Sequence, residues 1–67
     1  MKYTVSWFNS LTMNSGFRGT YTSIEDAQKY ANREADQSRS FVTFEVWEGT
    51  PKTASAPVPN TKVQGKQ

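Results

Sequence analysis

Six carboxylates are the clearest candidates for acid–base catalysis or for binding a hard metal ion: Glu25, Asp26, Glu34, Asp36, Glu45 and Glu48. The chain has no cysteine and no histidine, which excludes thiol catalysis and removes the soft ligands of zinc. The first two acids fall at the start of a predicted helix, the next two on its solvated face, and the last two on opposite sides of one strand. No pair is brought together, so we expect neither an enzyme nor a cofactor or metal site.

A different chemistry, contact with a partner, is indicated by the segment 41–48. Val42, Phe44 and Val46 alternate with other residues, which is the period of a strand with one face in the core. The opposite face carries two large aromatic side chains, Phe41 and Trp47. Tryptophan is enriched where proteins bind one another, so this face is predicted to be a contact surface.

The first third of the chain predicts a β-hairpin. Residues 2–8 and 17–22 alternate and are rich in β-branched and aromatic types, and residues 9–16 between them contain the turn formers Asn, Ser and Gly. An eight-residue loop is long for a hairpin, and long loops are often functional. Leu11 and Met13 in this loop either fold back onto the core or form an apolar tip for a partner.

Residues 23–37 predict a helix. Ser23 is the expected N-cap, and Thr22 with Glu25 three residues later is an alternative capping frame. The apolar positions that follow form one narrow stripe of mostly small residues: Ile24, Ala27, Ala31 and Ala35. Small side chains let a helix lie close to a sheet.

The basic charge of the chain is concentrated at its end. Residues 1–50 hold five basic and six acidic side chains, so their net charge is −1, whereas residues 51–67 hold three lysines and no acid. The latter segment also has three prolines and no aromatic residue. We therefore expect a folded unit over 1–50 and a disordered, flexible tail over 51–67.

These elements predict an α+β fold with a three-stranded antiparallel sheet of order 2-1-3 and one helix on one face. Strand parity assigns these residues to the core: Tyr3, Val5, Trp7, Phe17, Tyr21, Ile24, Ala27, Ala31, Val42, Phe44 and Val46. The open face of the sheet is predicted to carry Thr4, Ser6, Phe8, Arg18, Thr20, Thr22, Phe41, Thr43, Glu45 and Trp47.

From this face and the loop we predict a partner-binding surface made of Phe8, Leu11, Met13, Arg18, Phe41, Glu45 and Trp47. A protein partner is the first hypothesis. Single-stranded nucleic acid is an alternative, because aromatic side chains on a sheet can stack on bases, but few cations are available for phosphate. A homodimer through the same face is another alternative, because a second copy would complete the small core. The aromatics can also simply cap the sheet edges or pack under the loop or tail. No membrane segment is expected, and the default location is the cytoplasm.

The strand-strand-helix-strand order, with the helix start Thr22-Ser23-Ile24-Glu25-Asp26-Ala27-Gln28, resembles small phage-encoded proteins. The layout over residues 2–50 is similar to the T7-type inhibitor of host RNA polymerase and to compact anti-CRISPR proteins. The arginine-bearing third strand of the polymerase inhibitor is not matched, because Glu45 and Glu48 stand in the corresponding strand here. The resemblance implies a viral inhibitor that takes part in host takeover by occupying a surface of a larger host protein.

Overall fold

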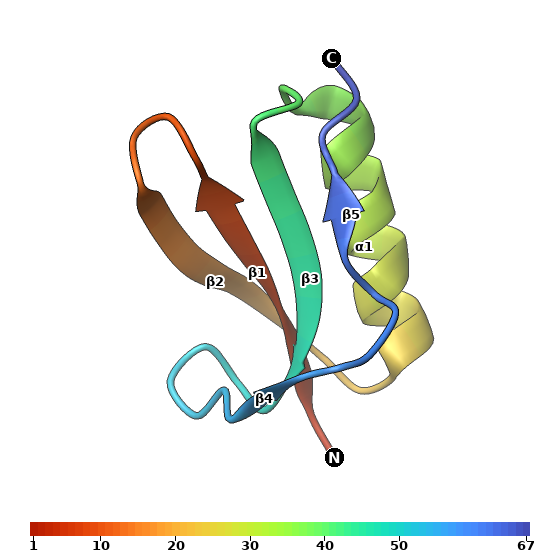
Figure 1. Cartoon of the computed structure of the whole chain (residues 1–67). Coiled ribbons are helices and arrows are strands. Elements are labelled where there is room, and N and C mark those ends of the chain that lie inside the picture. The colour runs from red at the N-terminus through yellow and green to blue at the C-terminus, as the bar shows by residue number, and fades with distance from the viewer.

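The strand that comes first in the chain lies between the other two long strands of the sheet. β1 (Tyr3–Asn9) pairs antiparallel with both β2 (Asn14–Tyr21) and β3 (Val42–Glu48). The computed structural model describes all 67 residues and shows one helix, α1 (Ile24–Gln37), packed across one face of the sheet (Figure 1). The α+β class and the order of these three strands are confirmed. The helix is too short and too polar to cross a lipid bilayer.

The β1–β2 loop is shorter than the sequence predicts. It comprises only residues 10–13, because the two strands extend as far as Asn9 and Asn14. The Asn9 side chain accepts hydrogen bonds from the backbone N–H groups of Leu11 (2.9 Å) and Thr12 (3.2 Å). Met13 closes the turn with a φ of 62°, so the tight loop results from asparagine capping the turn and one residue in the left-handed region.

Ser23 caps the helix, as the first of the two frames predicts. Its side-chain oxygen accepts a hydrogen bond from the N–H of Asp26 at 3.1 Å. Ala27, Ala31 and Ala35 are fully buried against the sheet, which confirms the stripe of small residues. Ile24 was expected in the core but is 39% exposed, because it is the first residue of the helix and lies at the rim of the sheet.

The core combines the alanines of α1 with alternate residues of β1 and β3. Val5, Phe44 and Val46 are buried, as strand parity predicts. Other predicted core residues, Tyr3, Trp7, Tyr21 and Val42, are partly buried and pack against this cluster. Parity therefore assigns the faces of β1 and β3 correctly.

Parity fails in β2 because the strand contains a bulge. Val5 lies opposite Arg18 and Tyr3 lies opposite Tyr21, so three steps along β2 match two steps along β1. Gly19 sits within this step with a φ of 75°, a conformation that glycine adopts without strain. Because of this extra residue, the β2 residues before Gly19 lie on the opposite face of the sheet from the one that simple alternation predicts.

Two predicted positions are corrected by this bulge. Phe17 was expected in the core, but it lies opposite Ser6 on the open face and is 36% exposed. Arg18 was expected on the open face, but it lies on the helix side with its guanidinium 5.8 Å from the centre of the Trp7 ring. Phenylalanine and arginine have thus exchanged faces relative to the simple alternation.

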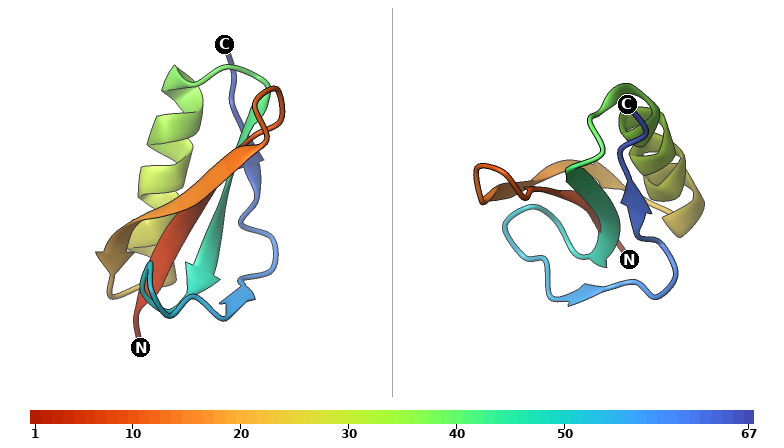
Figure 2. Two further views of the ribbon diagram at one scale, coloured as in Figure 1. Left: turned by 90° about the vertical axis from the view of Figure 1, so that its left-hand side faces the viewer. Right: turned by 45° about the horizontal axis from the view of Figure 1, so that its top comes forward.

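The tail, residues 51–67, is ordered, contrary to the sequence prediction. It forms two short strands, β4 (Ala56–Pro57) and β5 (Val63–Gln64), which both pair with the outer edge of β3 (Figure 2). The sheet therefore has five strands rather than three. Between them, Val58 joins the hydrophobic core at 9% exposure, and its N–H donates to the carbonyl oxygen of Val46 at 2.8 Å.

The end of the tail docks on the C-terminus of α1. The N–H of Lys66 donates to the carbonyl of Ala35 at 2.9 Å, and the N–H of Gln67 donates to that of Ser38 at 3.0 Å. A side chain on Gly65 would collide with the carbonyl of Arg39, so the close approach requires glycine. The tail thus adds hydrogen-bond donors to carbonyl groups at the end of the helix, where few intrahelical donors remain. Backbone hydrogen bonds and the burial of Val58 together account for its order.

Thr61 lies between β4 and β5, where the tail does not pair with β3 as a strand. Its side chain takes the place of a backbone hydrogen-bond partner for β3. It is 4% exposed, and its hydroxyl accepts from the N–H of Val46 (3.1 Å) and donates to the carbonyl of Val58 (2.8 Å). The turn before it has Asn60 at a φ of 63°, which asparagine tolerates. One side chain therefore holds the middle of the tail against the sheet.

Replacing Thr61 with valine is expected to lower the free energy of unfolding by about 1–3 kcal/mol, because the buried N–H of Val46 loses its acceptor. Urea unfolding followed by circular dichroism measures the change. Thr20→Val is the matched control: Thr20 is exposed in β2, and the same substitution there should change stability by less than about 0.5 kcal/mol. Equal effects at the two positions would contradict the role of the Thr61 hydroxyl.

Candidate functional site

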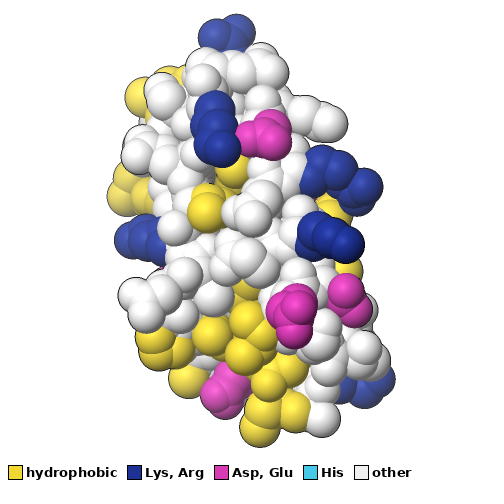
Figure 3. All heavy atoms as spheres, turned by 90° about the vertical axis from the view of Figure 1, so that its right-hand side faces the viewer, with side chains coloured by type: hydrophobic (Ala, Val, Ile, Leu, Met, Phe, Trp, Pro, Cys, Tyr) yellow, Lys and Arg dark blue, Asp and Glu magenta, His cyan; other side chains and the backbone are white.

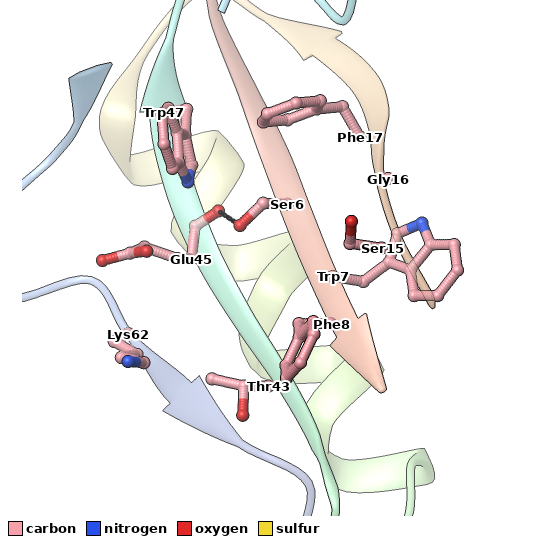
Figure 4. A pocket seen from close by; sticks show the side chains of 10 residues that line it. All are labelled: Ser6, Trp7, Phe8, Ser15, Gly16, Phe17, Thr43, Glu45, Trp47 and Lys62. Atoms are coloured by element: carbon pink, nitrogen blue, oxygen red, sulfur yellow. Dashed lines mark hydrogen bonds between the residues drawn. The ribbon is translucent and has the colours of Figure 1, made fainter. Parts of the chain in front are cut away.

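A groove crosses the open face of the sheet, on the side away from α1. We call it the open-face groove; its volume is about 310 Å³. Side chains from all three long strands and from the tail shape it, chiefly Ser6, Phe8, Phe17, Glu45, Trp47 and Lys62 (Figure 4). A volume of this size is at the lower end of small-molecule pockets and accommodates one or two side chains of a partner.

An aromatic pair closes one end of the groove. The rings of Phe17 and Trp47 meet edge to face, with centroids 5.5 Å apart and planes inclined at 81°. They come from β2 and β3, so they meet across β1, where the residues between them are small (Figure 4). Thr4 of β1 was expected to be exposed on this face, but it is fully buried because it lies opposite Trp47 and donates from Oγ1 to the Gly19 carbonyl.

The indole N–H of Trp47 is buried and has no hydrogen-bond acceptor. Its nitrogen is turned toward the middle of the groove, near Ser6 and Glu45 (Figure 4). The Ser6 hydroxyl does not serve it, because that hydroxyl donates to the Glu45 carbonyl oxygen at 3.2 Å. Buried polar groups without partners are rare in folded proteins and destabilise them. A ligand that offered a hydrogen-bond acceptor to this N–H would therefore be stabilised here.

Phe8 lies at the other end of the groove. It is 37% exposed, and its neighbours on β2 and β3 are the polar residues Ser15 and Thr43. No aromatic ring is paired with it. A large apolar ring among short hydroxyl side chains remains available for contact.

The charges around the groove balance. Glu45 is on β3 and Lys62 on the tail, and neither takes part in an ion pair; the one salt bridge of the chain joins Lys66 to Asp36. On the face formed by α1 and the tail, positive and negative side chains are mixed, and hydrophobic ones gather at its lower end (Figure 3). No three acidic residues cluster anywhere. The site therefore offers apolar contact and hydrogen bonding rather than a strong field of one sign.

A second aromatic cluster lies on the helix side. The rings of Tyr21 and Tyr30 are 5.6 Å apart, and the guanidinium of Arg33 lies 5.9 Å from the Tyr30 ring. Burial raises the pKa of the Tyr21 hydroxyl above its ordinary value, and the neighbouring Tyr30 adds to the shift. Both effects disfavour the ionised form of this hydroxyl.

Of the predicted site residues, the structure brings Phe8, Glu45 and Trp47 together in the groove. Arg18 lies on the other face, as described. Phe41 is half-buried in the turn immediately before β3 and is not part of the groove. Its carbonyl accepts a hydrogen bond from the N–H of Ser10 at 3.0 Å.

The remaining two predicted residues stand apart at the tip of the β1–β2 loop. Leu11 and Met13 are each 71% exposed, so they do not fold back onto the core. Sequence reasoning missed Phe17 and Lys62. Gly19 inside a strand pattern was a signal for a bulge and could have revealed Phe17. The Pro59-Asn60 turn was the only signal that the tail returns to the sheet and places Lys62 at the groove.

Comparison with models of known protein families, with curated proteins and with solved structures finds no match to this chain. The function of the open-face groove must therefore be argued from its own geometry and chemistry.

Proposed function

We propose that the protein is a non-enzymatic binding module that engages a partner protein through the open-face groove. The observation that carries this proposal is that three aromatic side chains lie at the two ends of the groove, the Phe17–Trp47 pair at one end and Phe8 at the other. Aromatic anchors in a partly enclosed site are typical of the centre of protein interfaces.

The chemistry of the groove favours a particular kind of ligand group. Phe8 and Phe17 present apolar surface, and the Trp47 N–H lacks an acceptor. A partner side chain with an apolar body and a hydrogen-bond acceptor, or an apolar side chain next to a main-chain carbonyl, suits both features. The N–H is shielded from solvent, so the indole ring must turn slightly to receive that acceptor.

Nucleic acid is less well supported as a ligand. Affinity for nucleic acid depends on cationic contacts to phosphate, and the groove has one cation, Lys62, beside one acid, Glu45. Arg18, which could have supplied a second cation, lies on the opposite face. These positions favour a protein partner over a single strand.

The resemblance to phage-encoded inhibitors suggests who the partner is. The proposed partner is a host protein of the transcription or anti-phage defence machinery, met in the cytoplasm of the host cell. Binding by steric occupation of a surface, without chemistry, is consistent with the scattered carboxylates.

The test measures the affinity of the partner protein for the wild-type chain and for a double variant, Phe17→Ala with Trp47→Ala. Removal of two anchors should weaken binding by at least about 2 kcal/mol, roughly 30-fold. The matched control, Leu11→Ala with Met13→Ala, removes two exposed apolar side chains outside the groove and should leave binding unchanged. Circular dichroism confirms that each variant is folded.

Three results would overturn the proposal. Partners retained equally by wild type and by the groove variant would show that the groove is not the contact. Loss of binding in the loop variant alone would place the contact at the loop tip. Quenching of tryptophan fluorescence by an oligonucleotide, weakening as salt rises, would instead identify a nucleic-acid ligand.

A further inference from the structure

We propose that the free edge of β2 pairs with the same edge of a second copy of this chain, forming a two-fold symmetric dimer with a continuous sheet. β2 is the end strand of the sheet, and β1 is the only strand that it pairs with. Its outer side is uncovered in the view onto that edge (Figure 2, left). This inference does not depend on the proposed function of the groove.

The two edges of the sheet differ in how they are protected from pairing with another strand. The outer edge of β3 is covered by the tail, which brings a proline, Pro57, and a lysine, Lys62, to that side. β2, in contrast, is eight residues long and contains no proline, no lysine and no acid. Those are the devices by which proteins usually prevent edge-to-edge pairing. β2 does contain two other such devices: the bulge at Gly19, near its end, and one charged side chain, Arg18.

Symmetry limits the possible registers. A two-fold axis perpendicular to the sheet preserves its faces, so paired residues must lie on the same face. Centring the axis on Arg18 would place two like charges directly opposite each other, which is destabilising. Centring it on Gly16 would place no side chain at the centre. Centring it on Phe17 places two phenylalanines directly opposite each other, which is a favourable cross-strand pair once the rings turn toward the axis.

The register centred on Phe17 is complementary on both faces. On the open face, the two Phe17 rings join the two Trp47 rings into one aromatic row, because each Phe17 already contacts its own Trp47. On the helix face, Arg18 of one copy lies opposite Gly16 of the other. The Trp7 ring lies directly against Gly16, within about 3 Å of where a Cβ would be. Each arginine therefore reaches a tryptophan of the other copy as well as its own.

The dimer is closed and small. Because the tail covers the other edge of the sheet, pairing cannot continue from the dimer into a filament. Because the bulge limits the paired stretch to about five residues on each strand, the interface falls below the size of standard stable ones. We therefore expect a weak dimer that forms as concentration rises and dissociates on dilution.

A charge-exchange experiment tests this register, because only the residue on the axis meets its own copy. Sedimentation of the full chain should show a rising average mass with concentration. Phe17→Lys and Phe17→Glu, each alone, should associate at least about 10-fold more weakly, since like charges then face each other. An equimolar mixture of the two variants should recover association. Gln37→Lys and Gln37→Glu introduce the same charges at an exposed site on α1 and should behave as wild type, alone and mixed.

Three results would overturn the proposal. A wild-type chain that remains monomeric at the highest attainable concentration excludes the dimer. Association of either Phe17 variant at wild-type strength, or no recovery in the mixture, excludes this register. Association that Trp47→Ala abolishes, while the mixed Phe17 variants fail to recover it, places the contact on the open face instead of the edge.

Discussion

A chain shortened to end at Pro51 is expected to be largely unfolded at room temperature. The truncation removes Val58 from the core, a side chain worth about 1.5–3 kcal/mol when buried. It also removes the hydroxyl of Thr61 and the backbone hydrogen bonds to Ala35 and Ser38, each worth about 0.5–1.5 kcal/mol. Because small domains have a net stability of about 5–15 kcal/mol, this loss is comparable to the whole.

Far-UV circular dichroism and thermal melts of the truncated and full chains measure the effect. Gly65→Ala is a subtler version, because one methyl group collides with the Arg39 carbonyl and should partly release the end of the tail. Lys52→Ala serves as the control, since Lys52 is exposed and its side chain should not affect the melting temperature. A truncated chain that melts within a few degrees of the full chain would mean that the tail contributes nothing to the fold.

Phe44→Ala should lower the free energy of unfolding by about 3–5 kcal/mol, more than any other single side-chain truncation in the sheet. Phe44 is 5% exposed and lies opposite Trp7 on one side and Val63 on the other. Its removal leaves a cavity under α1 that the surrounding strands cannot fill. In a domain of this size the variant would be close to unfolding.

Trp47→Ala should cost much less, although tryptophan is the larger residue. Its ring lies on the open face, contacts Phe17, and carries an N–H without an acceptor. Removing the ring therefore sacrifices surface contact but also eliminates an unsatisfied group. Trp47→Phe keeps a ring and removes only the N–H, and it should remain within about 1 kcal/mol of wild type. Urea unfolding of the three variants gives the order, and equal losses for Phe44→Ala and Trp47→Ala would show that both faces of the sheet are buried.

Hydrophobic alternation was sufficient to predict β1, β3 and their inner faces. Val5, Phe44 and Val46 are buried because both strands are regular over their whole length. The helix was predictable because its cap and its alanine stripe are local patterns, and local patterns do not depend on distant partners.

The site was only partly predictable, because it depends on irregular features. One extra residue near Gly19 exchanged Phe17 and Arg18 between the two faces of the sheet, and alternation alone cannot detect such a step. The tail was misjudged for a different reason. An argument from composition counts apolar residues, whereas residues 51–67 are held by one buried valine, Val58, together with backbone hydrogen bonds and the side chain of Thr61.

The central position of β1 determines how the chain can assemble. Its pairing with β2 joins residues that are close in sequence, such as Asn9 and Asn14, whereas its pairing with β3 joins Tyr3 to Glu48. The hairpin can close early, but a two-stranded ribbon alone is marginal in water. Closure over the long separation is slower, so the rate of folding is governed by the arrival of β3. During synthesis, one edge of β1 is therefore expected to stay unpaired until β3 has left the ribosome.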